Sequence, residues 1–130
     1  RQWARKSPEL AAQWASDLPE GQGRRDCMVA ITHVWLEMDE SAAARWLDHH
    51  EDGASRDAAV SQYVFRLVQK DPEAAFRWSE SVQNEKERHQ LMGSAILSWL
   101  RTEPQKARAA LQASDFPEEQ KRSLLQMNPQ

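Results

Sequence analysis

Apolar residues in this chain recur in two alternating kinds of segment, and both have the spacing of an α-helix. The first kind opens with Ser7 and Pro8, which are favoured at a helix N-cap and at the first helical position. It keeps its apolar residues close together on the helical wheel. The second kind starts near Arg24 and spreads its apolar residues over a wider arc, from Cys27 to Leu36. No strand-like alternation or hairpin turn interrupts the pattern. The pattern therefore predicts an all-α chain built from pairs of helices.

These pairs repeat every 32 residues, and we call positions separated by that interval a column. All six tryptophans lie in two columns: Trp14, Trp46 and Trp78 in one, Trp3, Trp35 and Trp99 in the other. The repeat predicts units at 7–38, 39–70, 71–102 and 103–130, within one domain spanning 1–130. Residues 1–6 then read as the end of a preceding, truncated repeat. Residues 103–130 read as a C-terminal capping pair, because Lys106 and Arg108 replace the apolar Leu10 and Ala12 of the first unit.

The columns also predict helix boundaries and a core. First helices should begin within about two residues of Pro8, Glu40, Pro72 and Pro104, and second helices near Arg24, Arg56 and Arg88. The fold expected is an α-solenoid of antiparallel helix pairs. We expect Trp14, Trp46, Trp78, Trp35 and Trp99 to be buried, with Trp3 more exposed. A further column, His33, Phe65 and Leu97, should pack on the other side of the second helices.

The stretch Asp71-Pro72, Ala75 and Trp78 spells D-P-x-x-A-x-x-W, which resembles the start of a tetratricopeptide repeat. The resemblance covers three units and, more weakly, the fourth. The sequence departs from that family in its period, which is 32 rather than 34 residues. It also has Leu18, His50 or Val82 where the family has glycine. The resemblance implies a superhelical scaffold whose first helices line a concave face for peptides or partner proteins. It implies no cofactor and no chemistry.

Composition narrows the classes of function. The chain is 28% charged with a formal net charge of −3 and both signs interspersed, which argues against nucleic-acid binding. No apolar run approaches the roughly 18 residues of a membrane span. The single cysteine, Cys27, rules out an intrachain disulfide and is expected to be a small buried hydrophobe.

The stretch Asp48 to Asp52 is the nearest approach to a metal motif. His49 and His50 are adjacent, so on a helix their side chains diverge by roughly 100°. Zinc ligands must converge, so a solvated turn is the better interpretation. The sequence supplies no His partner that would make Cys27 a nucleophile, and we predict no metal, cofactor or enzymatic activity.

Arg24, Arg56 and Arg88 form a column of cations near the starts of second helices, where the helix dipole opposes positive charge. We expect each guanidinium to reach the last carbonyls of the preceding helix or an acidic side chain. A ligand-binding role is the alternative.

The exposed face of the first helices is the better candidate for a binding site. Its candidate partner-binding residues are Gln13, Arg45, His49 and Arg77. In one interpretation Arg77 pairs with Glu73 and Glu80, and Arg45 with Asp48, within their own helices. In the other, Arg45 and Arg77 form a ladder that holds an acidic peptide. The sequence thus favours a noncatalytic protein-interaction scaffold, the C-terminal repeat segment of a larger protein. The alternative is a structural spacer that supports another domain.

Overall fold

A computed structural model describes residues 7–50 and 53–127, and within these ranges the chain is all-α, with no strand. The helices are α2 (Pro8–Ser16), α3 (Gln22–Met38), α4 (Glu40–His49), α5 (Ala54–Lys70), α6 (Pro72–Glu80), α7 (Glu85–Thr102), α8 (Pro104–Ala113) and α9 (Glu118–Met127). None of the helices in the described ranges is both long and apolar enough to cross a membrane. The predicted fold class is confirmed at the level of an all-helical protein.

All four first helices begin at the predicted residues, and polar side chains cap three of them, α2, α4 and α6. Ser7, Asp39 and Asp71 each accept a hydrogen bond from the backbone N–H three residues ahead. Asp39 and Asp71 also end the preceding helix, so consecutive pairs are joined by a single residue. Helices α3 and α5 begin two residues before Arg24 and Arg56. Helix α7 begins three residues before Arg88, because Asn84 caps it by accepting from the N–H of Glu87.

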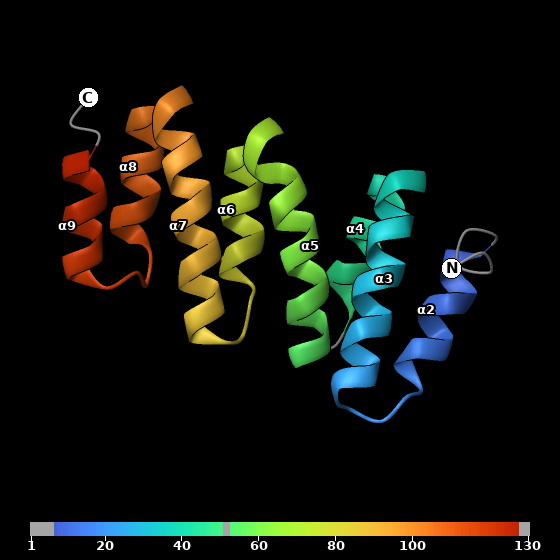
Figure 1. Cartoon of the computed structure of the whole chain (residues 1–130). Helices are drawn as coiled ribbons and strands as arrows, with labels where there is room; N and C mark the ends of the chain where they lie inside the picture. Colours follow the sequence, from blue (N-terminus) through green and yellow to red (C-terminus); the bar gives the residue numbers. More distant parts are fainter. Residues whose placement is uncertain (1–6, 51–52, 128–130) are drawn as a thin grey trace.

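The helices lie side by side in the order of the sequence (Figure 1). The longer helices α3, α5 and α7 pack against one another in succession, and α6 packs against both α5 and α7. In Figure 1 the shorter helices α4, α6 and α8 lie behind this row, and α9 follows α8 at the C-terminal end. The polypeptide therefore forms two layers of helices, one made mainly of first helices and one of second helices.

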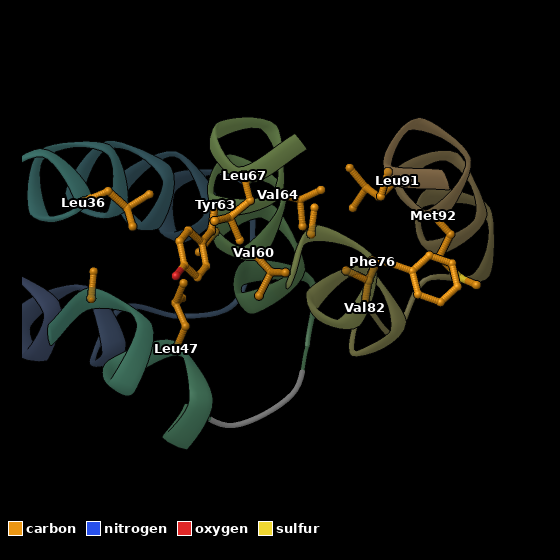
Figure 2. Packing of buried hydrophobic residues seen from close by; sticks show 14 of the residues in the cluster. Leu36, Leu47, Val60, Tyr63, Val64, Leu67, Phe76, Val82, Leu91 and Met92 are labelled. Carbon is orange, nitrogen blue, oxygen red and sulfur yellow. The ribbon is translucent and has the colours of Figure 1, made fainter. Parts of the chain in front are cut away.

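The core runs continuously between these layers. Figure 2 shows Tyr63, Val64 and Leu67 of α5 in the core. In this view Leu47 of α4 lies below them and Phe76 of α6 lies to their right. One column is alanine in all four units and is fully buried, and it comprises Ala11, Ala43, Ala75 and Ala107. A small side chain at this position allows a neighbouring helix to come close.

The tryptophans are buried to different extents. Trp35 and Trp99 are buried, while Trp46 and Trp78 are half-buried and pack on a ring of the preceding second helix. Trp46 lies 5.0 Å from Trp35 and Trp78 lies 5.2 Å from Tyr63, measured between ring centroids. The prediction for Trp14 is wrong, because its side chain is 50% exposed. Unlike Trp46 and Trp78, Trp14 belongs to a helix that no second helix precedes within the described ranges. Trp3 lies outside the described residues.

The packed column predicted on the second helices is also wrong. Phe65 is 62% exposed, Leu97 is 39% exposed, and His33 faces solvent beside Glu37, with 3.6 Å between Nε2 and the carboxylate. Each second helix contacts the first helix of its own unit and the helices of the next unit with the same side of its surface. The column of His33, Phe65 and Leu97 lies on a different side, which faces solvent. Cys27 is partly buried against the core, close to its expected environment.

Candidate functional site

The column of arginines near the starts of the second helices closes the turn within each pair. Arg56 is buried, and its Nε donates to the carbonyl oxygen of Leu47, in the last turn of α4, at 2.9 Å. Arg88 donates from Nη1 to the carbonyl oxygen of Val82 at 3.1 Å. Arg24 is half-buried and lies 3.5 Å from the carboxylate of Glu20. These contacts confirm that the column has a structural role.

In the fourth unit a different residue donates the hydrogen bond to the end of the first helix. Its column position is Gln120, but the neighbouring Lys121 is buried and donates to the carbonyl oxygen of Gln112 at 3.0 Å. A cation thus satisfies the C-terminal end of α8 even though the column itself is broken. Pattern matching by column could not find this contact, because the residue is displaced by one position.

The same edge of the molecule carries hydrogen bonds between neighbouring units. Asp57 is 3% exposed, and its carboxylate accepts from the N–H groups of Gln83 and Asn84 at 2.9 and 3.0 Å. Ser55 donates to the carboxylate of Glu20 at 2.7 Å, which joins the second unit to the first. These contacts fix the loops of successive units relative to one another.

Arg88 joins the third unit to the fourth at this edge, with 2.8 Å between Nη2 and the carboxylate of Asp115. Burial alone would raise the pKa of Asp115, but the hydrogen bonds and charges of Arg88 and His89 outweigh it and lower that pKa. Sequence reasoning missed Asp57 and Asp115 because neither belongs to a column. Their partners lie about one repeat away in the chain.

Cavities open along the line between neighbouring first helices, which we call a seam. Two of them share a composition. The Arg45 pocket, at the seam of α2 and α4, has a volume of about 580 Å³ and is lined by Ser16, Arg24, Arg45, Trp46, His49 and His50. The Arg77 pocket, at the seam of α4 and α6, has a volume of about 400 Å³ and is lined by Ala44, Arg45, Asp48, Arg56, Arg77, Trp78 and Ser81.

These two pockets are the same site displaced by one repeat. The columns that they share are Ser16 with Asp48, Arg24 with Arg56, Arg45 with Arg77, Trp46 with Trp78, and His49 with Ser81. Each pocket therefore combines an exposed arginine on a first helix, the adjacent tryptophan, and a second arginine anchored in the turn. The 32-residue period of the sequence therefore places two arginines and a tryptophan in both pockets.

Two further pockets share columns with each other, but they are displaced by two repeats and not by one. One lies at the seam of α2 and α4, has a volume of about 540 Å³, and includes Glu9, Gln13, Asp17 and Trp35. The other lies at the seam of α6 and α8, has a volume of about 480 Å³, and includes Trp99. Gln13 thus lines a cavity whose charged side chains are acidic, and not either of the arginine pockets.

Arg45 and Arg77, which were both predicted as binding residues, line one cavity. They differ in whether the guanidinium forms an ion pair. Arg77 pairs with Glu73 on its own helix, as one interpretation expected, although its side chain remains 71% exposed. Arg45 is exposed and forms no ion pair among the described residues, so the expected pair with Asp48 is not made there. Of these two guanidinium groups, only that of Arg77 therefore has an acidic partner among the described residues.

Other predicted partners on this face also differ from expectation. Glu80 is not within ion-pair distance of Arg77 in the described part of the chain. Burial and the charge of Asp115 raise the pKa of Glu80, and the charge of Arg77 only partly offsets this. His49 lines the Arg45 pocket, with its Nδ1 2.8 Å from the carbonyl oxygen of Arg45.

No group of three or more His, Cys, Asp or Glu side chains in residues 7–50 and 53–127 is arranged to hold a metal ion. Glu51 and Asp52 of the Asp48 to Asp52 stretch lie outside the described residues. The solvent-facing chemistry of the seams is thus cationic and aromatic in two pockets, and acidic or mixed in the other two.

Comparison of the chain with models of known protein families, with curated proteins and with solved structures found no match in any of the three.

Proposed function

We propose that this chain is a noncatalytic protein-interaction scaffold, in which tetratricopeptide-like helix pairs stack as an α-solenoid and the first helices present a peptide-binding face. The observation that carries the proposal is the equivalence of the Arg45 and Arg77 pockets, column by column. A stack of equivalent units offers a repeated series of subsites to an extended ligand.

The chemistry of these pockets suits recognition of a peptide. Tryptophan and arginine are the residues most enriched among those that dominate binding energy at protein interfaces. Trp46 and Trp78 are only half-buried, so part of each indole remains available beside an exposed guanidinium. The cationic side chains favour an acidic partner, whose approach the positive charge accelerates.

A structural spacer is the second candidate, and a different observation supports it. The contacts of Asp57 and Asp115 fix neighbouring units to one another without any ligand. A spacer needs this stiffness and no binding pocket. The two proposals differ in a single respect, which is whether the first-helix face binds anything.

Selection from a random peptide display library separates the two. The wild-type chain should enrich acidic peptides, and the double variant Arg45→Glu with Arg77→Glu should lose them. A matched control is Arg101→Glu with Arg122→Glu, since both residues are exposed and neither lines any of the four pockets described above. Both double variants should keep the helical circular dichroism signal, because exposed charges contribute little to stability. If no peptide is enriched on the wild-type chain, the scaffold proposal is wrong and the spacer remains.

A further inference from the structure

The two arginine pockets are equivalent by column, but they differ at one charged position. In the column where the Arg77 pocket has Asp48, the Arg45 pocket has Ser16. A carboxylate in the wall of a pocket repels an anionic ligand, whereas a hydroxyl can donate a hydrogen bond to one. Within the described residues, every polar side chain that lines the Arg45 pocket can donate a hydrogen bond to an anion. The two pockets are therefore suited to different ligands.

The arginines anchored in the turns differ as well. Arg56 donates to the carbonyl oxygen of Leu47 at 2.9 Å and to the carbonyl and hydroxyl oxygens of Ser81 at 3.3 and 3.2 Å. Its equivalent in the Arg45 pocket is Arg24, whose Nε is buried with no hydrogen-bond partner among the described residues. Buried polar groups are nearly always hydrogen-bonded. The Nε–H of Arg24 is therefore a donor for which a bound anion would supply the acceptor.

The acidic neighbour of Arg24 does not satisfy this donor. The carboxylate of Glu20 lies 3.5 Å from Nη1 of Arg24, and its other oxygen accepts a hydrogen bond from Ser55 at 2.7 Å. One carboxylate thus contacts two partners, and it reaches the guanidinium through Nη1 and not through Nε. Glu20 is not among the residues that line the Arg45 pocket.

The first helix α4 adds further donors to the same cavity. Arg45 is exposed and forms no ion pair among the described residues. His49 uses Nδ1 to donate to the carbonyl oxygen of Arg45 at 2.8 Å, so in its protonated form the ring still has the N–H at Nε2 for a ligand. The half-buried indole of Trp46 supplies an apolar wall beside these groups.

These groups match a phosphoryl group better than a carboxylate. A phosphorylated serine or threonine carries a charge of about −1.5 to −2 at neutral pH and has three acceptor oxygens, enough for two guanidinium groups. A carboxylate has two oxygens, which one guanidinium can satisfy. Clusters of arginine are a recurring means of recognising phosphorylated residues in peptides. In the Arg77 pocket, by contrast, Arg77 pairs with Glu73 and Arg56 donates within the protein.

We infer that the Arg45 pocket binds the phosphoryl group of a phosphoserine or phosphothreonine in a partner peptide. Arg24 and Arg45 donate to its oxygens, and Trp46 contacts the residue beside it. This inference rests on the proposed function, since it names the ligand of one pocket on the same face. It goes further in assigning a phosphorylated partner to one pocket of an equivalent pair.

The direct test uses an array of synthetic peptides of varied sequence, each prepared with phosphoserine, glutamate or serine at the central position. The labelled full chain should bind a subset of the phosphoserine peptides. In fluorescence anisotropy the best of them should bind about tenfold or more tightly than its own glutamate form, because the phosphoryl group has more charge and one more oxygen. Equal affinity for the two forms, or no phosphoserine-dependent peptide on the array, would overturn the inference.

Variants identify which pocket holds the phosphoryl group. Ser16→Asp gives the Arg45 pocket the acidic residue that the Arg77 pocket already has, and should weaken phosphopeptide binding by about tenfold. Ser16→Asn should lose about twofold at most, because its amide still donates a hydrogen bond. Position 16 is exposed, so both variants should keep the helical circular dichroism signal. Equal losses in the two variants would contradict the assignment.

Neutralising single arginines makes the same distinction. Arg45→Gln should weaken phosphopeptide binding by about tenfold, and Arg77→Gln distinctly less, because Arg77 does not line the Arg45 pocket. Arg101→Gln, which changes the net charge equally at an exposed site outside both pockets, should leave the affinity unchanged. Equal losses for Arg45→Gln and Arg101→Gln would show that binding follows the net charge alone, and the inference would be wrong.

Competition with inorganic phosphate tests the source of the phosphoryl group. Inorganic phosphate should displace the labelled phosphopeptide at least about tenfold less effectively than the unlabelled phosphopeptide does, because it lacks the residues that contact Trp46. Equally effective displacement would mean that the pocket takes free phosphate or a small phosphate ester, and would overturn the assignment to a peptide.

The outcomes also distinguish this inference from the proposal on which it rests. If no phosphopeptide binds while the display library yields unmodified acidic peptides, the phosphoryl inference is wrong and the scaffold stands. If the library also yields none, both are wrong.

Discussion

Asp57 provides the most stringent test of how neighbouring units are held together. Its buried carboxylate in the first turn of α5 accepts two backbone hydrogen bonds from the loop before α7. Replacement by alanine removes both acceptors and leaves the N–H groups of Gln83 and Asn84 without them. The variant Asp57→Ala should therefore weaken the contact between the second and third units while leaving each helix pair intact.

The expected magnitude follows from these contacts. A hydrogen bond to a charged group contributes about 1.5–3 kcal/mol, so two such bonds correspond to about 3–6 kcal/mol. Burial of the carboxylate carries a desolvation cost that the alanine variant no longer bears, which offsets part of the loss. We expect a net loss of about 3 kcal/mol in the free energy of unfolding. Asp57→Asn should lose less, because the amide oxygen still accepts one hydrogen bond.

Urea unfolding followed by far-ultraviolet circular dichroism and tryptophan fluorescence measures this loss. The transition should also broaden or separate, because the stability of a repeat protein is approximately a sum of unit and interface contributions. Asp26→Ala is the matched control, since Asp26 is exposed and its one hydrogen bond among the described residues is from the side chain of Gln22 on its own helix. Its loss should be below about 0.5 kcal/mol. A loss for Asp57→Ala below about 1 kcal/mol, with an unchanged urea dependence, would refute the role assigned to this carboxylate.

Three other predictions follow from burial and charge. Trp99→Ala should cost about 3–5 kcal/mol on urea unfolding, and Trp14→Ala distinctly less, because Trp99 is 4% exposed and Trp14 is 50% exposed; equal losses would contradict the assigned core. The pKa of Glu40 lies below its ordinary value of 4.5, mainly through a hydrogen bond from a lysine on α5. The stabilisation by Glu40 is present above that value and is lost as the pH falls through the lowered pKa, so Glu40→Gln should be less stable than wild type by about 0.2–1 kcal/mol at neutral pH. The difference should disappear at acidic pH, and a constant difference across the titration would contradict the assignment. Glu73→Gln should tighten binding of the acidic peptides, because it releases Arg77 from its ion pair; weaker binding in anisotropy would show that Glu73 positions Arg77 for the ligand.

Much of the local structure was accessible from the sequence. Ser7, Asp39 and Asp71 identify the starts of first helices, because a capping side chain and the backbone it satisfies are three residues apart. The alanine column likewise coincides with fully buried positions. Both features depend on residues within one helix pair, so a period read along the chain is sufficient to find them.

The errors arose where a column was treated as if each member had the same neighbours. Trp14 shares a column with Trp46 and Trp78, but it is 50% exposed whereas they are half-buried. The column of His33 and Phe65 is periodic, yet it lies outside the packed arc of the second helices. Periodicity shows that positions are equivalent in the chain, but burial depends on what lies opposite each of them.

The sequence by itself determined the helical class, the capping of the first helices and the two arginine–tryptophan pairs, because each is set by residue types at short or strictly periodic separations. Only the tertiary structure decided that Arg45 and Arg77 share a cavity, that Arg77 is paired with Glu73 while Arg45 has no ion pair among the described residues, and that Asp57 joins two units. The physical reason is that a pocket or a buried carboxylate takes its partners from neighbouring units. Which side chains meet there depends on how the helices pack, which a repeat length does not specify.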